Sequence, residues 1–167
     1  MSDTTPAPKP SYRPIFGIAD SAAAIDEVID CAQHTLRIFD IDLVNRGFNS
    51  PQRAEKLRAF LVAGRAHRIL IALHDTDLLE RECPRLLTLL RQFPMSIEIH
   101  RTLGEARNAN DPFVLADDHS VWHQQHFQQP RAIVAVHSPP DALPIAQRFA
   151  EIWDLSEPSV SATTLGL

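Results

Sequence analysis

Two aspartates in one short run are spaced so that their side chains could take part together in chemistry. Asp40 and Asp42 stand two residues apart in the run FDIDL. Side chains two apart in a strand point to the same face, so the two carboxylates would lie together. Such a pair could perform acid–base chemistry or hold a cation. The alternative is a pair of strand-end carboxylates that accept hydrogen bonds from loop amides or pair with Arg46.

Three histidines form a second candidate group. His119, His123 and His126 follow the spacing H-x3-H-x2-H, which on a helix would share one face, as in metal sites. The surrounding run HSVWHQQHF is instead typical of a strand followed by a loop, and no nearby Cys or Glu completes a ligand set. We therefore expect loop histidines with contacts to a ligand or partner and no bound metal. The three residues are the candidate ligands should a metal bind.

The sequence lacks the glycine-containing motifs of nucleotide and hydrolase sites and the basic, aromatic-rich stretches of nucleic-acid sites. The chain has only five glycines and contains no G-x-S-x-G, G-x-x-x-x-G-K or G-x-G-x-x-G run. A nucleotide-cradling loop is therefore not expected, and neither is a cofactor. The most basic stretch, residues 53–68, has no interleaved aromatic platform for bases, and the formal net charge is -5. Nucleic acid is accordingly not an expected partner.

The elements that must position these residues alternate between helix and strand. Ser50, Pro51 and Gly64 are typical of the start and end of a helix, and RILIALH and RAIVAVH are typical of strands covered on both faces. Helix-length connections favour parallel strands, and a late hairpin adds antiparallel ones. The predicted fold is α/β, with a mixed, mostly parallel sheet sandwiched between helices. The predicted helices are 21–34, 51–64, 77–93 and 141–155; the predicted strands are 35–43, 68–74, 95–101, 113–116, 120–122 and 131–137.

The chain has the size and composition of one domain. We expect a flexible leader at 1–14, a single domain at 15–156 and a flexible tail at 157–167. No stretch approaches the roughly 20 apolar residues of a membrane span, and the start lacks a secretory pattern. Cys31 and Cys83 are far apart in the sequence, which is typical of reduced thiols. The expected location is the cytoplasm.

The layout from about residue 20 to 156 resembles one repeat of the phospholipase D superfamily. The most specific part is the ending, where PFVLADDHSVWHQQ gives an acidic turn and RAIVAVH gives a buried strand. A helix carrying Phe149 and Trp153 in an F-x-x-x-W pattern follows. The resemblance implies a phospholipase D-like half as the fold, as in a bacterial domain family.

The catalytic signature of that superfamily, H-x-K-x4-D, is not matched. With Asp117 at the acidic position, Asn110 takes the place of the histidine and Pro112 that of the lysine. With Asp118 there, the same places fall to Asp111 and Phe113. In the superfamily the histidine is the nucleophile at phosphorus and the lysine neutralises the developing charge. An amide and an imino acid do neither, so the resemblance implies the fold without its chemistry.

Polar side chains at strand ends would line what remains of the cleft. Each could instead be a structural ion pair or a satisfied strand-end group. The residues expected to line this vestigial cleft are Asp40, Asp42, His74, Asn110, Asp117 and Arg131.

Three functions follow from this combination. The leading one is a non-catalytic binding or regulatory module for an unknown small ligand or protein partner. A divergent phosphodiesterase or other hydrolase is an alternative. It would have to act as a homodimer, because the superfamily builds one active site from two repeats. The third is an interaction subunit that docks a larger enzyme.

Overall fold

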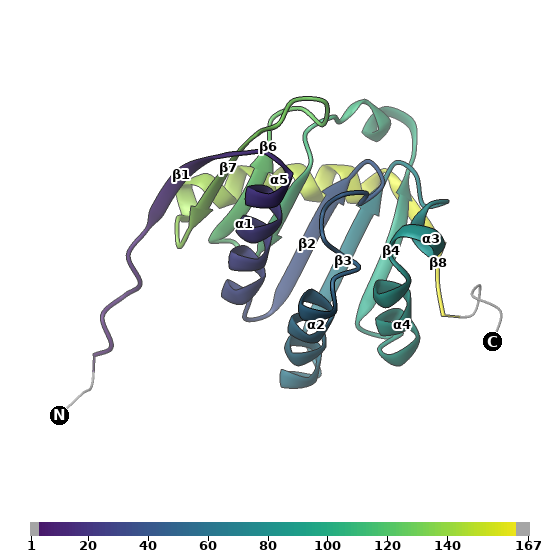
Figure 1. Ribbon diagram of the computed structural model, residues 1–167, viewed down its shortest axis with the longest axis horizontal. Coiled ribbons are helices and arrows are strands. Elements are labelled where there is room, and N and C mark those ends of the chain that lie inside the picture. The colour runs from purple at the N-terminus through teal and green to yellow at the C-terminus, as the bar shows by residue number, and fades with distance from the viewer. Residues whose placement is uncertain (1–3, 163–167) are drawn as a thin grey trace.

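An eight-stranded sheet forms the centre of the molecule (Figure 1). The computed structural model describes residues 4–162. Within this range the strand order is β1-β7-β6-β5-β2-β3-β4-β8. The strands are β1 (Ser11–Phe16), β2 (Thr35–Asp40), β3 (Arg68–Leu73), β4 (Ile97–Thr102), β5 (Phe113–Ala116), β6 (Ser120–Gln124), β7 (Arg131–Val136) and β8 (Ser156–Val160).

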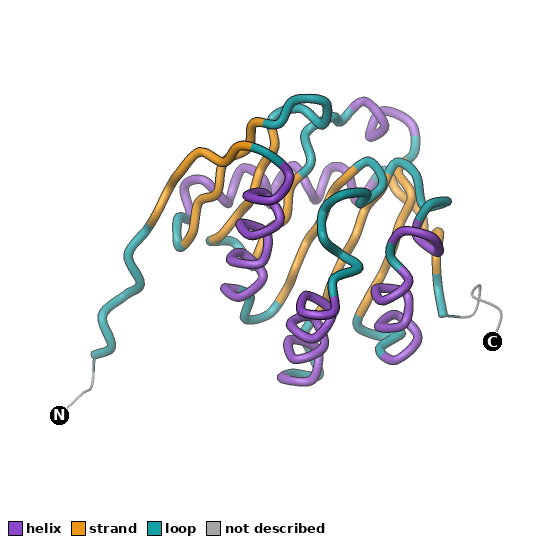
Figure 2. The backbone as a smooth tube through the Cα atoms, in the orientation of Figure 1, coloured by secondary structure: helices purple, strands orange, loops and turns teal. Residues whose placement is uncertain are grey.

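Helices cover both faces of this sheet. α1, α2 and α4 pack on one face and the long α5 crosses the other, which gives two separate apolar cores (Figures 1 and 2). No helix in residues 4–162 has the length and apolar character that crossing a bilayer requires. The helices are α1 (Ile18–Cys31), α2 (Pro51–Ala63), α3 (Leu79–Glu82), α4 (Pro84–Gln92), the 3-10 helix η1 (Gly104–Asn108) and α5 (Pro139–Asp154).

The sequence signals for helix ends are confirmed at α2. The hydroxyl of Ser50 accepts a hydrogen bond from the Arg53 amide, Pro51 occupies the first turn and Gly64 follows the last residue. The single helix expected at 77–93 is split in two. Pro84 has no N–H to donate to the preceding turn, so it begins α4, and the short α3 ends at Glu82 with Cys83 between the two helices.

The sheet is mixed, as expected, but its parallel part is small. Parallel pairing is confined to β2–β3 and β3–β4, and the other five strand pairs in the described part of the chain are antiparallel. The expectation of a mostly parallel sheet was therefore wrong. The expectation failed because the hairpin β5–β6 and the outermost strands β1 and β8 all pair antiparallel.

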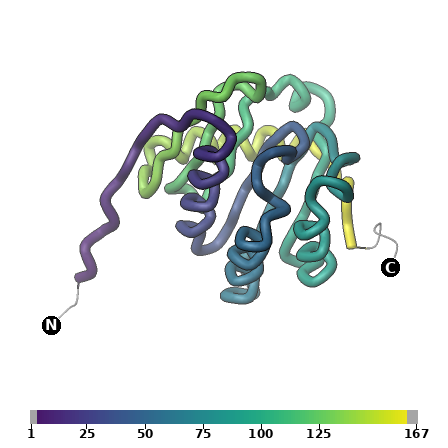
Figure 3. Tube along the Cα trace, in the orientation of Figure 1, coloured from purple at the N-terminus to yellow at the C-terminus, as the bar shows by residue number. Residues whose placement is uncertain are grey.

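Both outermost strands lie in segments expected to be flexible. Ser11–Phe16 pairs with β7 at one margin of the sheet, and Ser156–Val160 pairs with β4 at the other. Figure 3 shows these first and last segments on opposite sides of the molecule. The domain as described thus extends beyond 15–156 at both ends. The remaining ends of the expected leader and tail, residues 1–3 and 163–167, lie outside the described residues.

One edge of the sheet collects the ends of the parallel strands. β2, β3 and β4 end there at Asp40, Leu73 and Thr102, and we call it the carboxyl edge. Antiparallel register brings Phe113 of β5 and His123 of β6 to the same edge. Long connecting segments gather at this edge (Figure 2), where ligands bind in many α/β proteins.

Candidate functional site

Asp40 ends β2 at the carboxyl edge and is almost fully buried. Its carboxylate accepts hydrogen bonds from the Ile41 amide (2.7 Å) and from Arg46 Nε (2.8 Å) and Nη2 (3.3 Å). Burial raises the pKa of Asp40, although the Arg46 charge opposes that shift. Arg46 also donates to the Gln124 side chain (2.8 Å) and lies over the ring of Trp122. These groups form a closed polar network with no side chain left open for chemistry.

Asp42 does not join Asp40 in a shared site. Its carboxylate accepts a hydrogen bond from the Val44 amide (3.0 Å), within a loop where Leu43 and Asn45 have positive φ. Of the alternatives for this pair, the structure supports carboxylates engaged by a loop amide and by Arg46.

His74 follows β3 and faces the α5 side. Its Nε2 donates to the Ala109 carbonyl (2.6 Å), since a carbonyl can only accept. Nδ1 therefore accepts from the Thr102 hydroxyl (2.5 Å). Burial lowers the pKa of His74, which favours the neutral ring. Both ring nitrogens are used, so His74 joins the ends of β3 and β4 to the loop after η1.

A second ionic group lies on the α5 side of the carboxyl edge. Asp111 is buried and accepts from His123 Nε2 (2.9 Å) on one oxygen and from Arg148 of α5 on the other. Burial opposes ionisation of Asp111, but the hydrogen bonds from His123 and Arg148 outweigh it, and its pKa is lowered. The loop after η1 is thereby fixed to α5 and β6.

Two more predicted residues lie near this edge without entering either network. Asn110 is exposed, and its backbone carbonyl accepts from the Phe127 amide (2.8 Å). Arg131 begins β7 and is exposed, on the far side of β6 and β5 from Asp40. Neither side chain contacts Asp40 or His74 in the hydrogen bonds of the described residues.

Asp117 lies at the opposite edge of the sheet. It follows β5, and its carboxylate accepts from the backbone amides of Gln33 (2.8 Å), His34 and Thr35 (both 2.9 Å). Burial acts against ionisation, but these hydrogen bonds prevail and the pKa of Asp117 is lowered. Asp117 therefore anchors the start of β2 and does not line the cleft with Asp40.

The three candidate metal ligands are not brought together. His119 lies 3.4 Å from Asp117 at the opposite edge, and His123 bonds to Asp111 at the carboxyl edge. His126 stacks on Phe127 in the following loop. Across residues 4–162, no three His, Cys, Asp or Glu side chains are arranged to hold a metal ion.

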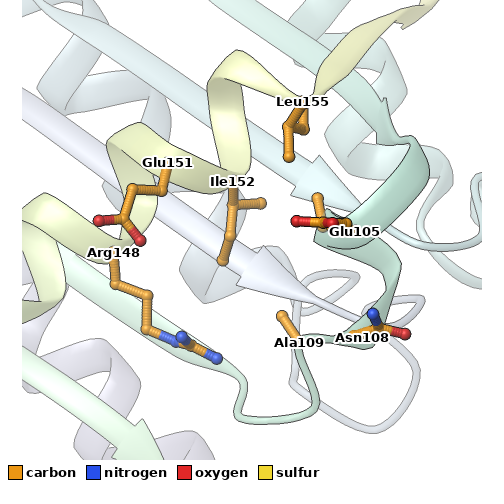
Figure 4. A pocket seen from close by; sticks show the side chains of 8 residues that line it. Glu105, Asn108, Ala109, Arg148, Glu151, Ile152 and Leu155 are labelled. Carbon is orange, nitrogen blue, oxygen red and sulfur yellow. The ribbon is translucent and has the colours of Figure 1, made fainter.

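A hollow of about 370 Å³ opens beside the Asp111 group, between η1 and α5 (Figure 4). Arg148 forms part of its wall, and Figure 4 shows the guanidinium pointing toward Ala109 and Asn108. The side chains lining it are Glu105, Ala106, Asn108, Ala109, Arg148, Glu151, Ile152 and Leu155.

The family assignment follows from the match of residues 18–165 to the model of "Domain of unknown function (DUF7931)". The chain belongs to this family. The match spans nearly all of the described fold, from the start of α1 past β8. No curated protein sequence matches the chain.

Solved structures show that this DUF7931 chain has the phospholipase D fold. It is similar to Nuc from Salmonella typhimurium, described as a phospholipase D family member, with a TM-score of 0.64 and 15% identity. The alignment covers 92% of this chain and 100% of Nuc. NucT from Helicobacter pylori has a TM-score of 0.59 and 11% identity, and the alignment covers 90% of this chain and 100% of NucT. The archaeal chromatin protein TrmBL2 has a TM-score of 0.62 and 14% identity. That alignment covers 89% of this chain but only 53% of TrmBL2. The expected resemblance is confirmed for the fold.

In both registers considered from the sequence, Asn110 with Pro112 or Asp111 with Phe113, the places of the motif histidine and lysine hold other residues. Asn110 and Pro112 precede β5, and Asp117 follows it. The chain has two lysines. Lys56 of α2 is paired with Asp30 of α1, and Lys9 precedes the end of β1 that lies at the opposite edge.

Sequence reasoning missed several residues of the carboxyl edge. Arg148 and Gln124 had no local signal, because their partners lie 37 and 78 residues away in the chain. Asp111 had a partial signal, since it stands at the histidine position in the second register of the motif. Thr102 directly follows the predicted strand 95–101, which is the only hint of its contact with His74.

Proposed function

We propose that this DUF7931 domain is a phospholipase D-fold module that binds a ligand or partner and does not hydrolyse phosphodiesters. The observation that carries the proposal is the pair of side chains at the motif positions. Asn110 is a poor nucleophile, and Pro112 has no N–H and no charge to place against a phosphate.

The surrounding polar groups support the proposal. A phosphoryl-transfer site needs cationic groups free to meet the transferred phosphate. Arg46 is paired with Asp40 and Arg148 with Asp111. Arg107 donates to the His74 carbonyl, and of the cations named at this edge Arg131 is the one left exposed without such a contact in the described residues. His74 uses both ring nitrogens within the protein. The buried polar groups of this edge are therefore bound to one another rather than left free for a phosphate.

The fold itself is compatible with a role in binding. TrmBL2, which shares it, is described as a chromatin protein with a novel mode of DNA binding. Fold alone does not fix chemistry, so a related architecture can serve recognition. For this chain the net charge of -5 argues against DNA as the ligand.

The test is hydrolysis of a generic phosphodiester such as bis(p-nitrophenyl) phosphate by the full chain. We expect no release of nitrophenol above the rate in buffer. Asn110→Ala is the informative variant, because the side chain is exposed and its loss leaves the backbone contact to Phe127 intact. Turnover that disappears in Asn110→Ala, or in Asp117→Asn with the fold retained, would refute the proposal.

One observation favours a second candidate, a divergent phosphodiesterase with a displaced nucleophile. His123 is oriented by Asp111 and lies near Arg148, which is the arrangement of a histidine with a carboxylate partner and a cation. This candidate predicts phosphodiester turnover that His123→Gln abolishes and Asn110→Ala leaves unchanged. It also predicts a homodimer, which size-exclusion chromatography with light scattering detects. A monomer without turnover excludes it.

A further inference from the structure

The hollow between η1 and α5 has charges of both signs around an apolar floor (Figure 4). We propose that this hollow binds a small zwitterion, namely a free α-amino acid with an apolar side chain. The proposal names the ligand class of the binding module and in that respect rests on the proposed function.

The donor for a ligand carboxylate comes from Arg148. Arg148 gives its Nε and Nη2 hydrogens to Asp111, and Nη1 has no hydrogen-bond partner within residues 4–162. Because Asp111 is held in turn by His123, the guanidinium is fixed before any ligand arrives. Asn108 also lines the hollow, and in Figure 4 it lies beyond Ala109 from the guanidinium. Arg148 Nη1 is therefore the charged donor that this wall of the hollow offers to a ligand carboxylate.

Acceptors for a ligand ammonium come from Glu105 and Glu151. Both are exposed, and neither forms an ion pair with another of the described residues. In the view of Figure 4 their carboxylates flank Ile152, with the Arg148 guanidinium and Asn108 on the other side. The opposite charges of the hollow are thus separated, as those of an amino acid are.

The floor between these groups is apolar. Ile152 is buried, and Leu155, Ala106 and Ala109 complete the surface. The volume of about 370 Å³ is in the range of small-molecule sites. An apolar side chain on the ligand would remove this surface from water, which favours binding.

The charge balance selects a zwitterion over simpler ions. A carboxylate alone can accept from Arg148 Nη1 but is repelled by Glu105 and Glu151. An amine alone gains the contact with the carboxylates but not the one with Arg148 Nη1, which stays with water. Only a ligand with both groups satisfies both sides of the hollow.

The first experiment compares three probes by isothermal titration calorimetry on the full chain. These are L-leucine, 3-methylbutan-1-amine, which lacks the carboxylate, and 4-methylpentanoate, which lacks the ammonium. We expect saturable binding of leucine, with each of the other probes at least about tenfold weaker because one charge-assisted contact is lost. Equal affinity for the amine, or no leucine binding up to about 10 mM, the weak end of specific association, overturns the inference.

The second experiment tests where leucine binds. Glu105→Gln and Glu151→Gln should each weaken leucine binding about tenfold, because each removes a charged acceptor from an exposed position. Glu80→Gln is the matched control, an exposed glutamate on α3 outside the hollow, and should leave affinity unchanged. Equal affinities for all three variants overturn the assignment to this hollow.

The two proposals fail separately. Phosphodiester turnover would refute the absence of catalysis whatever leucine does. Absence of both turnover and leucine binding would remove only the zwitterion site. Arg148→Lys adds a check on the carboxylate side, because a lysine cannot give Asp111 and a ligand carboxylate the same fork of N–H groups.

Discussion

Replacing Arg46 by Met should destabilise the protein strongly, because it leaves Asp40 buried without its counterion. Asp40 is 3% exposed and would keep only the hydrogen bond from the Ile41 amide. Methionine has a similar length and can still cover Trp122, so the variant removes charge more than packing.

The expected loss in the free energy of unfolding is about 3 kcal/mol, the lower end for breaking a buried ion pair by removing one partner. For a chain of 167 residues this corresponds to a fall in Tm of roughly 6–12 °C. We do not expect the larger losses that a broken buried ion pair can cause, because Asp40 can take up a proton and so lose its charge. Burial already raises its pKa, and loss of Arg46 raises it further.

The loss should therefore depend on pH. A carboxyl whose pKa is higher in the folded state binds protons preferentially there, so its contribution to stability is present below its unfolded pKa of about 4 and is lost as pH rises. Urea unfolding of wild type and Arg46→Met can be followed by the fluorescence of Trp122 and Trp153. The difference in the free energy of unfolding between the two proteins should be larger near pH 7.5 than near pH 4.5.

Two further variants separate this cause from others. Asp40→Asn combined with Arg46→Met should recover about 2 kcal/mol relative to Arg46→Met alone, because no buried charge remains. Arg131→Met, an exposed arginine without an ion pair in the described part of the chain, should stay within about 0.5 kcal/mol of wild type. A loss below about 1 kcal/mol for Arg46→Met at neutral pH, or a gap independent of pH, would refute the reasoning.

Two other predictions concern stability and thiol reactivity. Asp117→Ala should lower the free energy of unfolding by about 2–3 kcal/mol, because three backbone amides lose their acceptor. Asp117→Asn should cost less in thermal unfolding, since Asn tolerates the φ of 51° at this position; equal losses would contradict the argument. Since the pKa of Asp117 is lowered, its contribution is lost as pH falls below about 4, and Asp117→Asn should weaken that acid sensitivity. Burial raises the pKa of Cys83 to about 11, so Ellman's reagent should label it only on unfolding; rapid labelling of native protein would contradict its burial.

Much of the fold could be predicted from the spacing of apolar residues and from the residues typical of helix starts and ends. The predicted central strands and the last helix match the structure within a few residues, because their apolar faces are long and regular. β1 and β8 were missed for one shared reason. Each contains a proline, Pro14 or Pro158, which marks a run as non-strand in the interior of a sheet. Both strands are outermost, where a missing N–H is tolerated.

The site was less predictable, because its contacts cross the sheet. The sequence offered Arg46 as a partner for Asp40, and that alternative agrees with the structure. Asp117 was grouped with the cleft because it belongs to the same motif as Asn110. Seven residues at about 3.3 Å each span roughly 20 Å along a strand, so the two ends of the motif lie at opposite edges. Arg148 lies on the last helix, and only the packed fold brings it to Asp111.

The proposed lack of phosphodiester hydrolysis is consistent with the pairing of two buried-edge arginines. A site that keeps unpaired cations for a phosphate is less stable until the phosphate arrives, because those charges repel and lose hydration. In this chain Arg46 and Arg148 are paired with Asp40 and Asp111, which removes that cost. In the hollow beside Arg148 the exposed charged groups are the carboxylates of Glu105 and Glu151. A hollow with these two carboxylates repels a phosphodiester and attracts an ammonium group, so the proposed absence of hydrolysis and the proposed binding of a zwitterion support each other.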